Sequence, residues 1–445
     1  MERSRLSRDI LGVFSTRAVW TVLGAISGVI LARVLGPHDR GILALVMAVP
    51  ATTVTLVKLG ITQANVYYIN RERHSAVQVA SNAAGLAIVM GLTAAIVVWL
   101  FESTLLSTVL RDVPRWALAL ALVRVPFMLL DDYLYGVLQA VGQFKVYNTR
   151  LLLSEVLRLL LTVVALLVLD FGLFAAVLIQ TSINVFNLTW LVVTMRRRIP
   201  FTLRVDRALL RRQLGFGAKS YVQTVTAHLL LRADIYMVSY FLGPAQTAFY
   251  SLALRFTEMV LEIPQAVGLV LYPRLASLPD DQIHRLTAQA CRRTLLLTVL
   301  CSLAIVTFGP SVIVAWYGEA YAPAGTPLLW ACMGAVALSV FVILTRDFTS
   351  RNQQTVNIAA GVPALMLNVV LNLYLIPTHG IVGAAMATAV AYGVACAILL
   401  VFYLPGARLS IFDVLIAKRE DLQFFWNTTW GILQRAKVRF AGTSR

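Results

Sequence analysis

Cationic side chains within apolar, helix-length stretches constrain this chain more than any other feature. Placing one charge near the bilayer centre costs roughly 2.5 to 3.5 kcal/mol even on a lenient scale. Seven such charges facing lipid would cost about 17 kcal/mol or more, against a net domain stability of roughly 5 to 15 kcal/mol. Most of them must therefore face water, a partner or an anionic ligand. The seven are Arg17, Lys58, Arg124, Arg158, Lys219, Arg232 and Arg255.

The stretches around these cations predict a membrane protein that crosses the bilayer many times. Hydrophobic residues fill 59% of the 445 positions and charged residues 13%, which is too apolar for a water-soluble fold of this length. Twelve windows are long enough to span a hydrocarbon layer of about 30 Å as helices. They cover 10–34, 41–68, 77–100, 113–137, 150–169, 172–194, 215–242, 248–273, 291–314, 323–346, 355–376 and 381–404. The predicted fold is an all-α polytopic membrane protein with about 12 transmembrane helices.

The distribution of basic residues predicts the orientation of these helices. Of the 38 Lys and Arg residues, 27 lie in segments or window ends on the side of the amino terminus, four on the opposite side, and the remaining seven are the intramembrane cations named above. The positive-inside rule then places both termini in the cytoplasm. The net charge of +17 is explained by topology and by attraction to anionic phospholipids. Because the basic residues are scattered over many short loops, a nucleic-acid partner is disfavoured.

Catalytic and metal-binding patterns are not found in the sequence. The four cysteines lie in or beside apolar windows without metal or redox spacing, which favours free structural thiols. Neither a nucleophile constellation nor a glycine-rich phosphate loop is present. We therefore expect no enzyme activity, no metal site and no cofactor.

A repeated tripeptide indicates how the windows are organised. Leu35-Gly36-Pro37 and Leu242-Gly243-Pro244 match at an offset of 207 residues, each where the first helix of a six-helix half meets its second. A parallel repeat of two six-helix lobes follows from this match. The predicted divisions are 1–214 for an N-lobe with a basic cytoplasmic connector, 215–404 for a C-lobe and 405–445 for an amphipathic cytoplasmic tail lying in the membrane interface.

Three runs of sequence resemble a known family. They are Arg33 to Leu45; Asp234 to Met237 followed by Phe241 to Pro244 and Tyr250; and Asn368 to Pro377 followed by Gly380 to Thr388. In this order they resemble the polysaccharide-biosynthesis exporters, the lipid-linked oligosaccharide flippases of the superfamily that also contains the multidrug and toxin extruders. The resemblance spans residues 10–404. It implies a V-shaped, alternating-access carrier whose central cavity is walled mainly by helices one, two, seven and eight.

Four of the seven intramembrane cations fall on the helices that the resemblance assigns to the cavity wall. They are Arg17, Lys58, Arg232 and Arg255, and we expect them to bind substrate. The first two lie in the cytoplasmic half of the predicted membrane and the last two in the outer half. A diphosphate group can thus meet cations at both depths, and Arg is geometrically suited to phosphate.

Ion pairing is the alternative interpretation for part of this set. The spacing of three or seven residues places each candidate pair on one helical face. The pairs are Arg255 with Glu258, Arg158 with Glu155, and Arg124 with Asp131, the last bridged by a partner or water. Lys219 can instead extend its ammonium group to the cytoplasmic surface.

Other polar residues give weaker predictions. Gln180, Asn184 and Asn187 form a stripe on the sixth helix that suits sugar contacts or, equally, bonds between helices. Asp234 matches an acidic position typical of the family and is our candidate for coupling to a proton or sodium gradient; its alternative role is to orient a cavity arginine. His228 lies one turn before Arg232 and is expected to be a packing or hydrogen-bonding residue and not a proton carrier.

The favoured function is a flippase that exports an isoprenoid-diphosphate-linked oligosaccharide from the cytoplasmic to the outer leaflet of a bacterial inner membrane, for cell-surface polysaccharide assembly. Glycosyltransferases or a polymerase of the same pathway are the expected protein partners. The runner-up is an ion-coupled multidrug extruder of the same superfamily, which Asp234, Glu258 and Glu262 support. A membrane glycosyltransferase or ligase is disfavoured, because the predicted outer loops are short.

Overall fold

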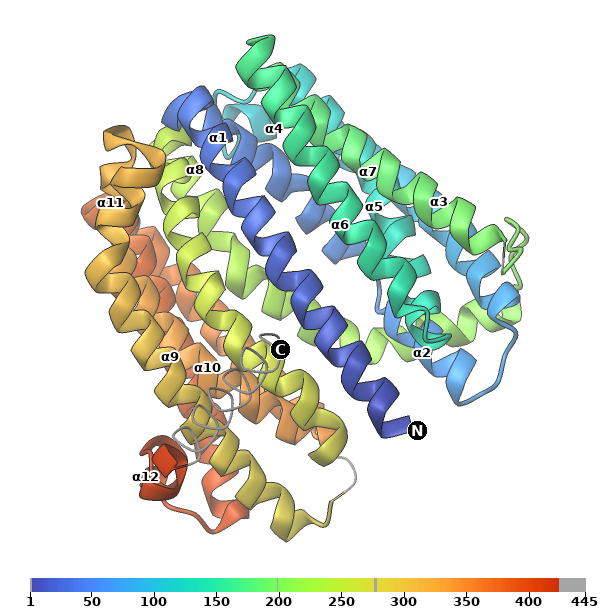
Figure 1. Ribbon diagram of the computed structural model, residues 1–445, viewed down its shortest axis with the longest axis vertical. Coiled ribbons are helices and arrows are strands. Elements are labelled where there is room, and N and C mark those ends of the chain that lie inside the picture. Colours follow the sequence, from blue (N-terminus) through green and yellow to red (C-terminus); the bar gives the residue numbers. More distant parts are fainter. Residues whose placement is uncertain (1, 198, 276–277, 424–445) are drawn as a thin grey trace, which may run out of the picture. The chain divides into compact units, whose positions relative to one another are not determined.

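The computed structural model shows a chain built from long helices (Figure 1). It describes residues 2–197, 199–275 and 278–423, with the side chains of 2–18, 144, 145, 147, 148, 218–220, 273, 280 and 281 left out. In chain order the helices are α1 (Glu2–Val57), α2 (Ile61–Asn70), α3 (Ala76–Leu100), α4 (Glu102–Ser107), α5 (Arg115–Ala140), α6 (Phe144–Thr162), η1 (Val163–Val168), α7 (Gly172–Arg196), α8 (Arg207–Leu275), α9 (Asp280–Tyr317), η2 (Glu319–Gly325), α10 (Leu328–Ser350), α11 (Gln354–Ala407) and α12 (Ile411–Leu415). The prediction of an all-α protein is confirmed for these residues.

Membrane-spanning character is clear in this helix set. Within the described ranges, seven helical stretches are long and apolar enough to cross a bilayer, by length and composition. They are Val19–Val57, Ala76–Leu100, Thr149–Val168, Gly172–Arg196, Gln282–Tyr317, Leu328–Ser350 and Gln354–Ala407. All twelve predicted windows overlap helical segments, although the second is interrupted between α1 and α2. The protein is therefore an all-α membrane protein, and twelve crossings remain a prediction.

Glycines at three positions break the longest helices. Gly36 in α1 has φ 70° and ψ 174°, and Gly243 in α8 has φ 80° and ψ −178°, two nearly identical conformations that favour glycine. Each is followed by a proline, which has no N–H to leave unbonded when the next helix begins. Gly380 breaks α11 in the same way, with φ 60°. The repeated Leu-Gly-Pro motif thus has the same local structure at both sites.

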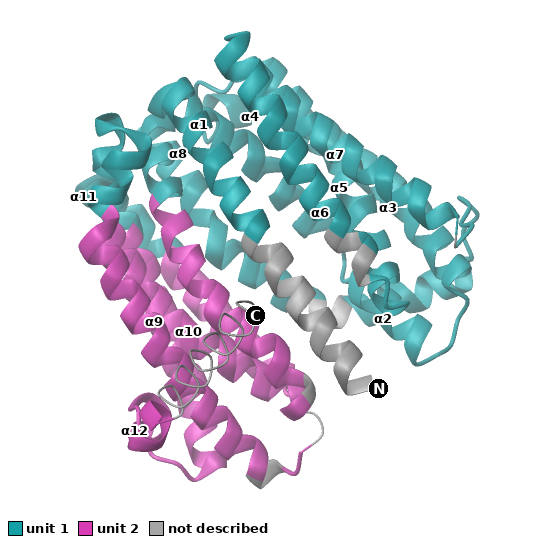
Figure 2. Ribbon diagram, in the orientation of Figure 1, with its two compact units in different colours: residues 1–252, 310–326, 369–384 teal, residues 253–309, 327–368, 385–445 magenta. Residues whose placement is uncertain are grey.

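The described helices divide into two compact units (Figure 2). Unit 1 comprises residues 1–252, 310–326 and 369–384, and unit 2 comprises 253–309, 327–368 and 385–445. The boundaries of these units differ from the predicted lobe boundaries at residues 214 and 404. The arrangement in two six-helix lobes stays a prediction. Within unit 1, α3 packs on α5, α1 on α6, and α5 on α7.

Two contacts in unit 1 fix the region around the first glycine break. A Cβ on Gly41 would lie 1.8 Å from the Pro244 carbonyl oxygen, so the two Leu-Gly-Pro regions touch backbone to backbone. Arg33 donates hydrogen bonds of 2.7 Å to the carbonyls of Ala315 and Trp316. These carbonyls belong to the last turn of α9. Carbonyl groups in the last turn of a helix lack a partner within the helix, and here Arg33 donates to them.

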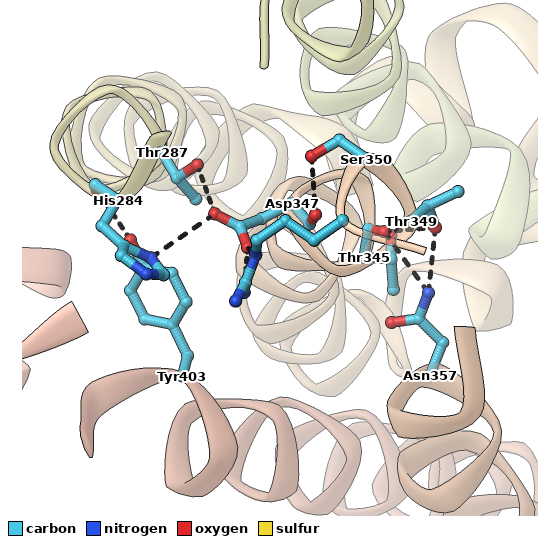
Figure 3. Close-up of polar contacts among 9 residues, drawn as sticks. His284, Thr287, Thr345, Asp347, Thr349, Ser350, Asn357 and Tyr403 are labelled. Carbon is cyan, nitrogen blue, oxygen red and sulfur yellow. Dashed lines mark hydrogen bonds and ion pairs between the residues drawn. The ribbon is translucent and has the colours of Figure 1, made fainter. Parts of the chain in front are cut away.

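A buried carboxylate connects the helix ends of unit 2 (Figure 3). Asp347 on α10 is 0% exposed and accepts hydrogen bonds of 2.8 Å from both Thr287 on α9 and Arg351. His284 Nδ1 lies 3.9 Å from the same carboxylate, and Tyr403 on α11 donates to the His284 carbonyl at 2.7 Å. Three helices are therefore tied together around one charge.

The chain after α11 is attached to α9 by a second carboxylate. Asp421 accepts hydrogen bonds from Arg292 Nε at 2.7 Å and Arg293 Nε at 2.9 Å. Burial alone would raise the pKa of Asp421, but the bonds from Arg292, the Lys418 backbone and Arg293 hold this pKa below its usual value. Its stabilising contribution is thus present at neutral pH and is lost as the pH falls below the ordinary aspartate pKa of about 3.9. The predicted amphipathic tail from 424 onward lies outside the described residues.

Replacing Asp347 by alanine should strongly destabilise unit 2, because Arg351 would remain half-buried without its counter-ion. Removing one partner of a buried pair costs about 3 to 5 kcal/mol of the free energy of unfolding. Thermal unfolding of the purified protein in detergent measures the effect, with the exposed Glu420→Ala as control. Equal melting temperatures for the two variants would contradict a structural role for Asp347.

Candidate functional site

A hydrogen-bonded cluster joins α1 and α8 inside unit 1. Thr52 Oγ1 lies 3.0 Å from His228 Nε2, and Thr55 Oγ1 lies 3.4 Å from the other ring nitrogen. Tyr236 donates a hydrogen bond of 2.8 Å to Thr52 Oγ1. The imidazole of His228 is therefore held between two hydroxyl groups of one neighbouring helix, and a third hydroxyl adjoins them.

Two of the predicted cavity cations lie near this cluster. The positive charges of Arg232 and Lys58 both act on His228. Arg232 is one turn beyond His228 on α8, and Tyr236 follows one turn later on the same face. Lys58 and Arg232 are both half-buried. Cations, hydroxyls and an imidazole are the donor set that proteins direct at phosphate oxygens.

Lys58 reaches this cluster from a helix break, and not from within a helix as the sequence predicted. The helix α1 ends at Val57, and Leu59 and Gly60 have φ of 45° and 68°, which end helical propagation. Tyr133 donates a hydrogen bond of 3.1 Å to the Lys58 carbonyl, which also accepts one of 3.1 Å from the backbone N–H of Ile61. The interruption is thus stabilised from α5.

Glycine allows α8 to approach this break closely. A Cβ on Gly217 would lie 2.1 Å from the Leu59 carbonyl oxygen, and one on Gly60 would lie 2.5 Å from the Gly217 oxygen. Any side chain at either position would push the helices apart, because real Cβ atoms do not approach within 3.0 Å. The three turns of α8 after Gly217 are thereby placed against the end of α1.

Asp234 is held on a different face of α8. It is 1% exposed and accepts a hydrogen bond from Tyr250, which lies beyond the Gly243 break. The bond spans the two halves of α8, so Asp234 contributes to their mutual orientation. Its predicted role in ion coupling stays a prediction.

The remaining predicted substrate-binding cations are placed as follows. The side chain of Arg17 lies outside the described residues, as does that of Lys219. Arg255 is exposed on unit 2, and in the described part of the chain no carboxylate lies within 4.0 Å of it. The expected pair of Arg255 with Glu258 is therefore not formed in this structure. The substrate-binding role of Arg17 and Arg255 stays a prediction.

Of the other predicted ion pairs, one is confirmed. Arg158 Nη1 lies 3.3 Å from Glu155 Oε2, as the three-residue spacing on one helical face predicts. The direct partner of Asp131 is Arg150 from α6, and compensation of Arg124 by Asp131 through a partner or water stays a prediction. Sequence spacing missed this because Arg150 comes from a neighbouring helix.

The polar stripe on the sixth predicted helix lies on α7. Gln180 is buried, and Asn184 donates a hydrogen bond of 2.8 Å to the Gln180 carbonyl within the same helix. Asn187 is half-buried. The choice between sugar contacts and bonds between helices stays open for these three residues.

The sequence interpretation did not include the hydroxyl groups of the cluster. It did expect a packing or hydrogen-bonding role for His228, and the contacts with Thr52 and Thr55 confirm the hydrogen bonding. A signal was present: His228, Arg232 and Tyr236 recur every four residues along one helical face, and Thr52 and Thr55 are three apart. Both helices were expected to wall one cavity. A contact between the polar face of α8 and the two threonines of α1 could therefore have been predicted.

The fold of this chain is similar to that of solved membrane transporters. The lipid II flippase MurJ in an inward closed conformation superposes with a TM-score of 0.74 at 13% identity, covering 98% of this chain and 99% of that one. An inward-facing multidrug resistance MATE family transporter gives 0.73 at 15% identity, covering 87% and 94%. At these identities the likeness concerns the fold alone.

The family is shown by the sequence itself. The model of the polysaccharide biosynthesis protein family matches residues 30–325, and the chain belongs to this family. The probable low-salt glycan biosynthesis flippase Agl15 of Haloferax volcanii is 26% identical over 188 residues, which cover 41% of this chain and 40% of that protein. The matched region therefore spans less than half the length of this relative. The chain is thus a membrane protein of the polysaccharide biosynthesis family with the fold of solved transporters.

Replacing Thr52 by valine should weaken the cluster, because it removes the hydroxyl that both His228 and Tyr236 contact. Losing these hydrogen bonds should cost about 1 to 3 kcal/mol of stability. Thermal unfolding should show a clear decrease for Thr52→Val. The matched control is Thr53→Val on the next residue, whose hydroxyl bonds only to the Val49 carbonyl of its own helix. A decrease no larger than that of the control would show that the contacts with α8 carry no energy.

Proposed function

We propose that the protein is a flippase that moves an isoprenoid-diphosphate-linked oligosaccharide from the cytoplasmic to the outer leaflet. The observation that supports this most is the cluster of Lys58, Arg232 and His228 with the hydroxyls of Thr52 and Tyr236. The hydroxyls and the imidazole are in hydrogen-bond contact between α1 and α8, and both cations act electrostatically on the imidazole. A diphosphate has the charge and the acceptor oxygens that such a set binds.

The membership in the polysaccharide biosynthesis family and the likeness to Agl15, a protein named for glycan biosynthesis, support a lipid-linked glycan as the substrate class. Transport in this proposal proceeds by alternating access in a V-shaped carrier with about 12 transmembrane helices in two lobes. Both termini lie in the cytoplasm of a bacterial cell and the chain resides in its inner membrane. Anionic phospholipids, glycosyltransferases and a polymerase of the pathway are the proposed partners.

An ion-coupled multidrug extruder is the second candidate function. The buried carboxylate of Asp234 favours it, because extruders of cationic drugs need acidic groups in the membrane. The cluster around His228 disfavours it, because two cations repel a cationic drug. The chemistry of the α1 and α8 faces thus favours an anionic substrate.

Neutralising Lys58 or Arg232 to glutamine should reduce export while membrane insertion and folding are retained. Loss of a charge-assisted hydrogen bond to phosphate of about 1.5 to 3 kcal/mol corresponds to roughly a 10- to 100-fold loss of affinity. Complementation of a flippase-deficient strain, with surface polysaccharide as readout, measures this. Arg232→Lys should be milder, since it keeps the charge but not bidentate binding.

The control for this experiment is Arg71→Gln, an exposed arginine that follows α2. Normally expressed Lys58 and Arg232 variants that export as well as this control would defeat the assignment. Export of a cationic drug by the wild-type protein, unaffected by these substitutions, would favour the extruder. Arg17→Gln tests the third proposed cation in the same assay.

The membrane potential should accelerate export. A substrate with two negative charges moves outward across an inside-negative membrane with a gain of roughly 2.3 kcal/mol per charge per 100 mV. Collapse of the potential with valinomycin and potassium should therefore slow transport in proteoliposomes. An Asp234→Asn variant tests ion coupling separately. If neither treatment changes the rate, substrate concentration alone drives transport.

A further inference from the structure

A short segment between α9 and α10 is attached to α1 within unit 1. This segment is η2, and Gly318 before it has φ 96°, a conformation that favours glycine. Tyr321 in η2 is 2% exposed and donates a hydrogen bond of 2.9 Å to the Ala32 carbonyl of α1. Its ring lies edge-on to Phe249 of α8, with 6.0 Å between the ring centroids. One side chain of η2 therefore contacts two other helices.

The next residue of α1 binds the end of the helix that leads into η2. Arg33 donates through Nε to the Trp316 carbonyl and through Nη2 to the Ala315 carbonyl, each at 2.7 Å. These acceptors lie at the carboxyl end of α9, where the helix dipole adds partial negative charge that favours a cation. Two consecutive residues of α1 thus bind the same segment, Ala32 as an acceptor and Arg33 as a donor.

These contacts join parts of the chain that the repeat assigns to different lobes. Ala32 and Arg33 belong to the predicted N-lobe, and their partners follow 282 to 289 residues later, in the predicted C-lobe. On the predicted topology both segments lie at the outer ends of their helices. The close backbone contact of Gly41 with Pro244 adds a third junction at the same predicted end. Polar and backbone contacts therefore close this end of unit 1.

We propose that Tyr321 and Arg33, with the carbonyls that they bind, form an outer latch that keeps the outer end of the carrier closed. Both have to release before a substrate can leave toward the outer leaflet. This inference rests on the alternating access of the proposed function, because a carrier of that kind exposes its site to one side at a time.

The chemistry of the outer latch suits reversible release. Arg33 is exposed, so its guanidinium can exchange the two carbonyls for water with a small net change in free energy. Tyr321 contributes a single neutral hydrogen bond through its hydroxyl. Loss of one such bond should shift the ratio of closed to open molecules roughly 2- to 10-fold toward the open state.

The test measures how accessible α1 is from outside. Ala48 is half-buried and lies one turn before Thr52 on the same face of α1, so Ala48→Cys provides a reporter thiol once the four native cysteines are replaced by alanine. A membrane-impermeant thiol reagent is added to spheroplasts. Tyr321→Phe and Arg33→Gln should each raise the labelling rate roughly 2- to 10-fold. Labelling rates equal to that of the protein with an intact latch would overturn the proposal.

Matched controls separate opening from general destabilisation. Tyr403→Phe removes a buried hydroxyl that donates to the His284 carbonyl at 2.7 Å, which is the same chemistry in unit 2. Arg115→Gln replaces an exposed arginine at the start of α5 that pairs with Glu102. Neither control should change the labelling of the reporter. An increase as large in the controls, or one found only in inside-out vesicles, would refute an outer latch.

A cross-link tests the outer latch in the opposite direction. Arg33 and Trp316 are both exposed, so Arg33→Cys and Trp316→Cys can be joined in the cysteine-free background by a short bis-methanethiosulfonate reagent. Export should be lost in the cross-linked protein and restored by reduction, and export at the rate of the unlinked protein would contradict the proposal. The labelling assay involves no substrate, so failure of the latch and failure of the flippase assignment give different results.

Discussion

The cost of placing a charge in hydrocarbon governs this structure. Several buried ions in the described residues are compensated by a group from a neighbouring element, and these contacts constrain how the helices are arranged. Asp347 connects the ends of α9 and α10 in unit 2 and Asp421 attaches the chain after α11 to α9. In unit 1, Asp131 with Arg150 connects α5 to α6. Because an isolated charge is so unfavourable in lipid, each of these pairs specifies which helices must be neighbours.

Breaks in the helices determine where polar groups are placed between them. The end of α1 at Val57 brings Lys58 to the candidate site, and the break at Gly243 lets Asp234 meet Tyr250. Irregular backbone at membrane depth is tolerated where the protein itself satisfies the freed carbonyl and amide groups. At the end of α1, the Lys58 carbonyl accepts hydrogen bonds from the Tyr133 hydroxyl and the Ile61 backbone N–H. Polar chemistry and backbone irregularity thus coincide, as expected for a carrier.

The sequence predicted the helices well and their contacts only in part. Apolar windows and the Leu-Gly-Pro motif located all the long helices and two of the three glycine breaks, because length, hydropathy and glycine preference are local properties. The pair of Glu155 with Arg158 was also local. Arg150 as the partner of Asp131, and Thr52 as the partner of His228, join helices that no spacing rule connects. Such contacts depend on how the helices pack against one another. Residue spacing within a single sequence does not contain that information.

The glycine breaks have a practical consequence for anyone who maps how this chain crosses the membrane. At Gly36, Gly243 and Gly380 one helix follows another with no loop between them. A reporter domain, a glycosylation acceptor or an epitope inserted there would interrupt two helices at once and, near Gly41, a contact with no room for a single methyl group. Labelling of these turns therefore has to rely on small, single-residue probes. A negative result from a larger insertion would show that the fold was disrupted, and it would not show on which side of the membrane the turn lies.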